Sequence, residues 1–233
     1  MPKNIRSGCK DNWNAFMVKG AKFTENDIPI CPTTAIQIPR KIISYAQAKT
    51  LYNKFKHQKN FFVEDFVHFY IDDHKFDSNN GIWADWRKAL KILKHFGGII
   101  TPDFSTNKDF PEPFKIFNTY RMRAFGYWYG TLKGGAVINN VRWGKKETFK
   151  YCFDGIPKNS IVAVGTVASG LKKLENRKLF SAGFEKMFEV LTPKIILVYG
   201  SDNYEFFDRV RNEIQIIHFQ SSKDLALRGE INE

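Results

Sequence analysis

Residues 161–199 decide the fold, and their sequence is IVAVGTVASGLKKLENRKLFSAGFEKMFEVLTPKIILVY. Two short apolar runs, Ile161–Gly165 and Ile195–Tyr199, enclose an amphipathic stretch. The apolar side chains of that stretch recur at helical spacing, at Phe180, Phe184, Met187, Phe188 and Leu191. Short, β-branched apolar runs are typical of strands buried on both faces, as in parallel sheets. The stretch therefore predicts a strand–helix–strand unit with a right-handed connection.

The same alternation continues on both sides of this unit. Further candidate strands lie at Val67–Ile71, Gly98–Thr101, Ala136–Val141 and Gln215–Phe219. We therefore predict an α/β fold with a mostly parallel sheet of about six strands. The sheet is either an open doubly wound sheet or an incomplete barrel, because strand order leaves no trace in local patterns. In both cases ligands are expected at the carboxyl ends of the strands.

Helix starts are marked by capping residues. Ser44 and Gln47 have the spacing of a capping box, so a first helix is expected to start at Ser44. Asp202 and Glu205 have the same spacing and predict a late helix. Two further apolar stripes support helices, one at Trp83, Trp86, Leu90 and Leu93 and one at Phe207, Val210 and Ile214.

The chain divides into three parts by composition. Residues 1–40 are a basic N-terminal segment that packs on or flanks the main domain, and the Pro-punctuated stretch Pro29–Pro39 joins the two. Residues 41–225 are expected to form a single α/β domain, and residues 226–233 a C-terminal tail. No low-complexity tract or Gly/Ser linker separates them.

The net charge of +12 is concentrated near the N-terminus. Residues 1–60 hold eleven Lys or Arg against three acids, which is 11 − 3 = +8, and no acid lies between Asp27 and Glu64. A basic surface attracts phosphate-rich partners because it releases their condensed counterions. Nucleic acid or a nucleotide is therefore the expected partner.

Several classes of protein are disfavoured. Cys9, Cys31 and Cys152 are too far apart for a zinc module or a disulfide scaffold. The first residues lack the apolar core of a signal peptide, and no apolar run is long enough to cross a bilayer, so we expect a cytoplasmic protein without a membrane partner. The segment Gly165–Lys172, GTVASGLK, departs from a P-loop because its lysine is one place late and no hydroxyl follows.

Polar residues follow the predicted strands and are expected to converge at one rim. Asp103 and Asp73 are the candidate catalytic acid/base residues, and Asp72, Asp73 and Asp103 are the candidate ligands of a divalent cation such as Mg²⁺. Helix capping and turn formation are the alternative roles of these aspartates. Candidate substrate-binding residues are Arg121, Asn118, Ser105, Trp143, Thr166, Tyr199 and Gly200.

Arg121 and Trp143 carry distinct expectations within this set. Arg121, with Asn118 on the same helical face, is expected to contact an anion, and pairing with a strand-end aspartate is an equally good alternative. Trp143 and Tyr199 are candidates to stack on a base, with core packing as the alternative.

Six segments in order resemble a known family. They are FYIDD, GGIITPDFS, NTYRMR, GGAVINNVRW, GIPKNSIVAVGT and IILVYG, and the likeness spans roughly Val67 to Ser201. They are similar to a bacterial and phage group known as domain of unknown function number four-four-one-seven. The resemblance implies a setting in phages and mobile elements and implies no particular activity. Its motif residues coincide with rim positions, namely Asp72, Asp73, Asp103, Ser105, Asn118, Arg121, Trp143, Thr166 and Gly200.

The leading functional hypothesis is a phage or mobile-element protein whose polar strand-end pocket engages a nucleotide or nucleic-acid phosphate. If the protein is an enzyme, phosphodiester or nucleotide chemistry is expected. The alternative is a non-catalytic interaction protein, for example a host-takeover or counter-defence factor, that binds DNA or an acidic partner through the basic residues of 40–59. A barrel-like enzyme acting on small acidic metabolites is a third hypothesis. The sequence leaves open whether the protein is an enzyme, and which oligomeric state it has.

Overall fold

The computed structural model describes residues 5, 7–167 and 169–221, and the predicted tail at 226–233 lies outside them. Its architecture is a single seven-stranded sheet. The strands are β1 (Ile42–Ser44), β2 (Val63–His68), β3 (Phe96–Ile100), β4 (Val137–Asn140), β5 (Ile161–Gly165), β6 (Ile195–Tyr199) and β7 (Gln215–Phe219).

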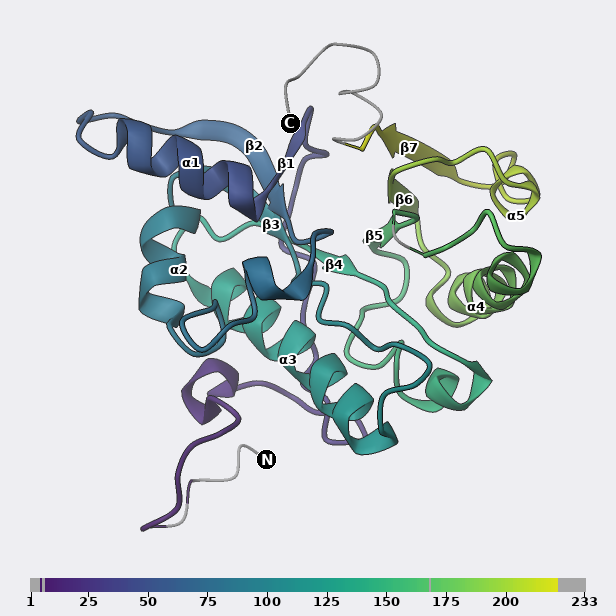
Figure 1. Cartoon of the computed structure of the whole chain (residues 1–233), viewed down its shortest axis with the longest axis horizontal. Coiled ribbons are helices and arrows are strands. Elements are labelled where there is room, and N and C mark those ends of the chain that lie inside the picture. Colours follow the sequence, from purple (N-terminus) through teal and green to yellow (C-terminus); the bar gives the residue numbers. More distant parts are fainter. Residues whose placement is uncertain (1–4, 6, 168, 222–233) are drawn as a thin grey trace.

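All neighbouring strands are parallel, and their order in the sheet is the order of the sequence. In a doubly wound sheet the order of the strands reverses at one point, whereas here it runs in one direction across the whole sheet. Because every right-handed crossover then lies on the same side, the sheet curls into an open half-barrel (Figure 1). The predicted α/β fold is confirmed, and of the two sheet arrangements the incomplete barrel is the one observed.

The side chains of the strands separate into an outer and an inner set by alternation. On β3 and β5, Ile99 and Val162 pack in the clusters that contain helix residues, whereas Ile100 and Ala163 belong to a cluster built from the strands themselves. The five helices therefore cover one face, and the other face lines the inside of the half-barrel. Both faces are apolar, which explains why the strands have continuous apolar sequences.

The helices are α1 (Tyr45–Phe55), α2 (Trp86–Leu93), α3 (Glu112–Thr131), α4 (Leu174–Leu191) and α5 (Glu205–Asp208). The predicted start of α1 is confirmed, because Ser44 and Gln47 form the reciprocal hydrogen bonds of a capping box. The predicted cap of α5 is wrong. That helix begins after Tyr204 without a side-chain cap, and the Asp202 carboxylate instead accepts a 2.8 Å hydrogen bond from Arg211.

Two separate helix-side cores lie on the outer face of the sheet. One joins β2, β3 and β4 to α1, α2 and α3, and the other joins β5 and β6 to α4 and α5. Strand β4 connects the halves, since Ile99 pairs with Val137 near the start of the strand and Ala163 pairs with Asn140 at its end. Each half of the sheet therefore has its own helix cover.

The extended segment before β1 fills the gap between the starts of β4 and β5. The backbone N–H groups of Thr34 and Ala35 donate to the carbonyl of Val137, at 3.1 and 3.2 Å. The hydroxyl of Thr33 donates to the carbonyl of Ile161 at 3.4 Å, and Cys31 N–H donates to the carbonyl of Gly155 at 2.8 Å. This segment takes over hydrogen bonds that the two strands do not make with each other there.

Within the described residues, the helices are too short or too polar to cross a bilayer.

Candidate functional site

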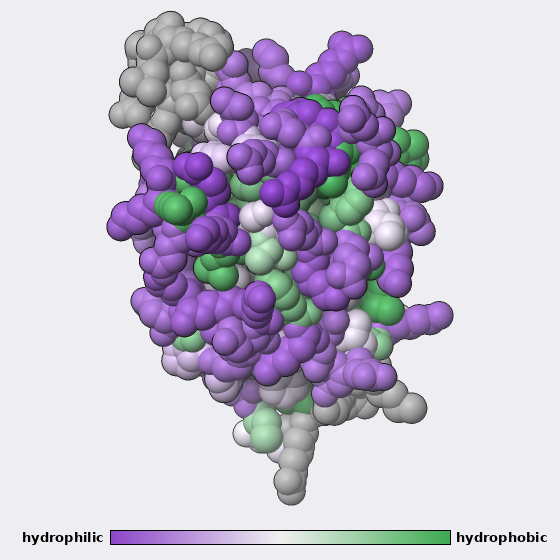
Figure 2. Space-filling model, turned by 90° about the vertical axis from the view of Figure 1, so that its right-hand side faces the viewer, coloured by the Kyte–Doolittle hydropathy of each residue, from purple (hydrophilic) through white to green (hydrophobic). Residues whose placement is uncertain are grey.

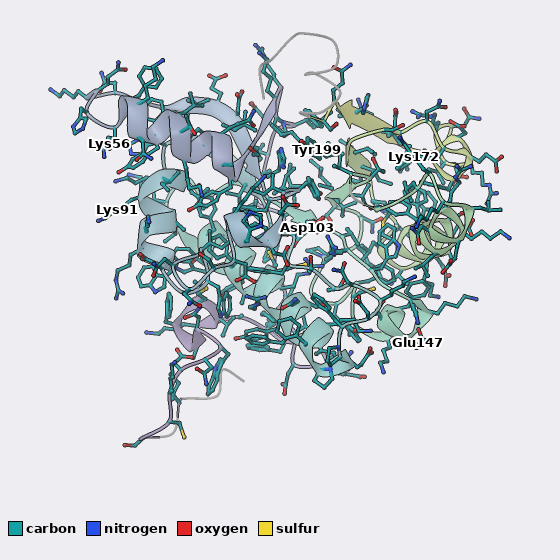
Figure 3. All side chains as sticks on the ribbon, viewed as in Figure 1. Lys56, Lys91, Asp103, Glu147, Lys172 and Tyr199 are labelled. Carbon is teal, nitrogen blue, oxygen red and sulfur yellow. The ribbon has the colours of Figure 1, made fainter. Side chains whose placement is uncertain are left out.

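The carboxyl ends of β2, β3 and β4 bring a group of polar side chains together. Tyr70 and Asp73 follow β2, Asp103 and Ser105 follow β3, and Asn140 and Arg142 lie at and after the end of β4. We call these six residues the rim cluster. In Figure 3, Asp103 lies near the middle of the molecule, between the two halves of the sheet. The predicted convergence of strand-end residues is therefore found at three neighbouring strands.

A chain of hydrogen bonds runs through the rim cluster. The hydroxyl of Tyr70 donates to Asn140 Oδ1 at 2.9 Å, and Asn140 Nδ2 donates to Asp103 Oδ1 at 2.8 Å. Asn140 is fully buried and Tyr70 is 8% exposed. Because each buried polar group has a partner, the chain fixes the orientation of the Asp103 carboxylate.

Arg142 forms an ion pair with Asp103. Its Nη1 lies 2.5 Å from Asp103 Oδ2, and its Nη2 lies 3.4 Å from Asn107 Oδ1. The side chains of Arg142 and Asp103 are 27% and 14% exposed. The ion pair is therefore only partly desolvated, and the guanidinium remains in contact with the solvent side of the rim.

Asp73 and Ser105 form a second pair beside the first. The Ser105 hydroxyl donates to Asp73 Oδ1 at 3.0 Å, and the Ser105 N–H donates to Asp73 Oδ2 at 3.3 Å. Burial raises the pKa of the Asp73 carboxyl, and the hydrogen bonds from Ser105 and the charge of Arg142 oppose this rise. A carboxyl with a raised pKa that touches a hydroxyl is suited to accept or donate a proton.

Arg121 and Asn118 lie on α3, and Asn118 contacts the rim residue Ser105. Arg121 is 5% exposed, and its guanidinium donates to Asn118 Oδ1 and to Asp77 Oδ1, at 2.6 and 2.8 Å. It also lies 3.9 Å from the ring centre of Phe104. Asn118 Nδ2 donates in turn to the carbonyl of Ser105 at 2.5 Å. The donors of Arg121 are thus engaged inside the protein, and its aspartate partner is Asp77 rather than one of the strand-end aspartates named from the sequence.

Trp143 lies in the helix-side core next to α4. Its ring centre is 4.8 Å from that of Phe180, and its indole occupies the space that a Cβ on Gly183 would need. This is the core-packing alternative for Trp143.

Tyr199 and Thr166 close the half-barrel from the opposite side. Tyr199 stacks on Tyr70 with 5.3 Å between ring centres, and its ring centre lies 4.1 Å from that of His68 in a tilted arrangement, although β2 and β6 are not neighbours in the sheet. The Thr166 hydroxyl donates to the carbonyls of Tyr199 and Ser201, at 3.2 and 2.9 Å. Gly200 has a φ of +99°, a backbone conformation that favours glycine. These residues build the mouth of the half-barrel.

The three candidate metal ligands do not form one site. Asp72 is exposed and pairs with Lys75 at 3.4 Å, whereas Asp103 is engaged by Arg142 and Asn140. Among residues 5, 7–167 and 169–221, no group of three or more His, Cys, Asp or Glu side chains is placed to hold a metal ion.

His68 and Asn140 are part of the site although the sequence analysis did not single them out. His68 is 1% exposed, and its Nδ1 accepts the N–H of Tyr70 at 3.2 Å. Burial lowers its pKa to about 3, so the ring is neutral. The signal was the period-two spacing of Phe66, His68 and Tyr70, which places all three on the inner face.

A basic cleft adjoins the rim cluster. Its volume is about 580 Å³, and it is lined by Lys108, Asp109, Lys145, Lys146, Glu175, Lys178, Leu179 and Ala182. Lys108 pairs with Glu175 at 3.5 Å. Within the part of the chain that the structure describes, Lys145, Lys146 and Lys178 form no ion pair. The cleft therefore presents unbalanced positive charge to solvent.

The cleft and the rim share two loops. Lys108 lies three residues after Ser105, and Lys145 lies three residues after Arg142. The third wall comes from the first turns of α4, which carry Glu175 and Lys178. The outer surface on the side of the molecule where α4 and α5 lie is largely hydrophilic (Figure 2).

Comparison with known proteins places the chain among phage relatives. The family model described as "Domain of unknown function (DUF4417)" matches residues 24–220. The chain is similar to the "Gene 1 protein" of Mycobacterium phage D29, with 32% identity over 139 residues, which are 59% of this chain and 49% of that protein. The "Gene 1 protein" of Mycobacterium phage L5 is 33% identical over 135 residues, which are 58% of this chain and 56% of that protein.

The matched region spans about half the length of these curated relatives. No solved structure matches the chain significantly.

Proposed function

The chain belongs to the DUF4417 family of domains of unknown function, and we propose that it binds the phosphate backbone of nucleic acid in the basic cleft beside the strand ends. The observation that carries the proposal is the set of lysines on the cleft, Lys108, Lys145, Lys146 and Lys178, against only two acids. A volume of about 580 Å³ is in the range of ligand sites.

The chemistry of the cleft favours phosphate over a carboxylate metabolite. Lysine ammonium groups act as point charges on flexible stems, which suits the repeated charges of a backbone better than the fixed fork needed for one planar carboxylate. The overall charge of +12 adds long-range attraction for a polyanion. Both properties predict binding that weakens steeply with salt.

A pair of triple variants tests the proposal. In the first, Lys145, Lys146 and Lys178 of the cleft are replaced by alanine. In the matched control, Lys54, Lys56 and Lys59 at the end of α1 and just after it are replaced by alanine, which removes the same charge elsewhere. Fluorescence anisotropy with labelled 20-mers, at a series of salt concentrations, gives the affinity and its salt dependence for each protein.

We expect the cleft variant to lose affinity and to show a flatter salt dependence, by about 0.7 to 0.9 in logarithmic slope for each phosphate contact removed. We expect the α1 variant to bind as the unchanged protein does. If instead the α1 variant loses binding and the cleft variant keeps it, the basic surface of residues 40–59 is the binding surface. Absence of binding to any 20-mer at low salt contradicts the proposal altogether.

A second function, phosphodiester hydrolysis of the bound strand, is favoured by the pairing of Asp73 with Ser105. In this reaction the Asp73 carboxylate takes a proton from a water molecule, the water oxygen bonds to phosphorus, and the bond from phosphorus to the leaving oxygen breaks. The leaving oxygen then takes a proton from solvent. Arg142 would contact the phosphoryl oxygens, and Asp103 would act as its positioning residue.

The adjacent aspartates provide a matched test of this second function. The labelled 20-mers are incubated with and without Mg²⁺ and separated on a denaturing gel. We expect Asp73→Asn to abolish cleavage and Asp72→Asn, on an exposed side chain that pairs with Lys75, to leave it unchanged. If the unchanged protein leaves the 20-mers intact both with and without Mg²⁺, the hydrolytic function is refuted and the proposed binding is unaffected.

A further inference from the structure

An exposed aromatic side chain lies at the start of α3. Phe114 is 45% exposed, and its ring centre lies 5.6 Å from that of Phe110. Single exposed apolar side chains are common on protein surfaces, so what Phe114 can do depends on the residues beside it. Phe114 is in the first turn of the helix, so it stands on a rigid element.

Two ion pairs hold this aromatic pair beside the basic cleft. Glu112, two residues before Phe114, pairs with Lys150 at 3.6 Å, at the end of the short helix that begins with the cleft residue Lys146. Lys108, two residues before Phe110, pairs with Glu175 of α4 at 3.5 Å. These pairs connect the loop before α3, the short helix and α4, and Phe110 lies two residues along the chain from Lys108, which lines the cleft.

The aromatic residues named from the sequence, Trp143 and Tyr199, are less exposed than Phe114. Trp143 packs against Phe180 and α4, and Tyr199 is 5% exposed under Tyr70. Of Phe114, Trp143 and Tyr199, Phe114 has the largest exposed fraction.

We propose that the cleft and Phe114 together form a site for single-stranded nucleic acid, in which the lysines contact successive phosphates and a base stacks on the Phe114 ring. The inference rests on the proposed function and adds the class of nucleic acid. Sequence-tolerant binding of single strands combines a basic groove with aromatic rings on which bases stack. In a duplex the faces of the bases are already stacked on each other, so a ring at the protein surface gains no such contact.

The experiment measures binding of labelled dT20, U20 and a 20-base-pair DNA duplex by fluorescence anisotropy. The variants are Phe114→Ala, Phe114→Tyr and the control Phe62→Ala, which removes another exposed ring, 59% exposed, before β2. Circular dichroism and thermal unfolding verify that each variant folds. Comparison of dT20 with U20 distinguishes DNA from RNA as the source of the strand.

We expect the unchanged protein to bind a single strand at least tenfold more tightly than the duplex. Phe114→Ala should weaken single-strand binding by about 5- to 150-fold, the effect of losing one base–aromatic stack, with the salt dependence unchanged. Phe114→Tyr should restore the affinity, and Phe62→Ala should bind as the unchanged protein does.

The failures of the two proposals are distinguishable. If the duplex binds as tightly as dT20 and U20, or if Phe114→Ala has no effect, the single-strand inference is overturned while lysine-dependent binding still stands. If Phe62→Ala weakens binding as much as Phe114→Ala, the effect is not specific to the cleft and the inference is also overturned. If none of the three probes binds, the proposed function fails and the inference fails with it.

Discussion

Replacement of Tyr70 by phenylalanine tests whether the hydrogen-bond chain at the mouth of the half-barrel contributes to stability. The substitution removes one atom, the hydroxyl that donates to Asn140 Oδ1 at 2.9 Å. The ring remains, so its stacking on Tyr199 is preserved. Asn140 is 0% exposed, so its carbonyl oxygen loses this donor in a place that bulk water does not reach.

The magnitude follows from the burial of the acceptor that is left behind. An unsatisfied buried acceptor costs about 1–3 kcal/mol of unfolding free energy. For a chain of this size that loss corresponds to a decrease in Tm of about 2–4 °C per kcal/mol. We therefore expect Tyr70→Phe to lower Tm by about 2–12 °C and to lower the urea midpoint without a change in the slope of the transition.

Tyr127→Phe is the matched control. The hydroxyl of Tyr127 donates to the carbonyl of Lys19 at 3.4 Å near the surface, where water replaces it. Its removal should change the unfolding free energy by less than about 0.5 kcal/mol. If Tyr70→Phe is as stable as this control in urea, the chain from Tyr70 through Asn140 to Asp103 does not hold the mouth together, and the account of the rim is wrong.

Three further predictions concern protonation and packing. Since burial lowers the pKa of His68 to about 3, the unfolded chain takes up this proton first as the pH falls below about 6.5. The free energy of unfolding therefore falls by about 1.4 kcal/mol per pH unit below this point, which amounts to about 2 kcal/mol at pH 5. The difference in urea stability between the unchanged protein and His68→Gln should shrink accordingly, and a constant difference would contradict a buried neutral ring. Because the pKa of Asp73 is raised, its ionisation destabilises the fold, so Asp73→Asn should gain stability relative to the unchanged protein as the pH rises through the Asp73 pKa; a gain that falls with pH would show the opposite shift. Gly183→Ala should cost about 1–3 kcal/mol in thermal unfolding, because its Cβ overlaps the indole of Trp143, and a stable variant would mean that the indole moves freely.

The strands could be predicted well where their neighbours bury both faces. Ile161–Gly165, Ile195–Tyr199 and Gln215–Phe219 have the same bounds in the sequence and in the structure. The strand predicted at Val67–Ile71 lies instead at Val63–His68, because Glu64 and Asp65 interrupt the apolar run in the exposed first half of β2. Strand β1 (Ile42–Ser44) was missed, since three residues ending in a helix cap carry no periodic signal.

The candidate site could be predicted as a location and less well as a set of contacts. Asp73, Asp103 and Ser105 do lie at the strand ends, which parallel pairing alone requires. Whether an arginine faces solvent or the interior depends on what surrounds it in the fold. Arg121 belongs to α3 and is enclosed by Asp77, Asn118 and Phe104, whereas Arg142 follows β4 and reaches the rim.

The basic cleft could not be predicted because its lysines come from three separate parts of the chain. Lys108 and Lys145 belong to loops after different strands, and Lys178 belongs to α4. Each appears in the sequence as an ordinary solvated lysine. Only the curl of the sheet, which depends on strand order, brings them to one place.

The segment that fills the gap between β4 and β5 has a consequence for how the chain folds during synthesis. Thr33 leaves the ribosome early, yet its partner Ile161 is made 128 residues later. At about 5–20 residues per second, this delay lasts on the order of ten seconds. Contacts so distant in sequence form slowly, because the closing loop loses entropy before it gains contacts. We therefore expect the first half of the sheet to assemble on the nascent chain, and the N-terminal segment to complete its docking only when β5 has emerged.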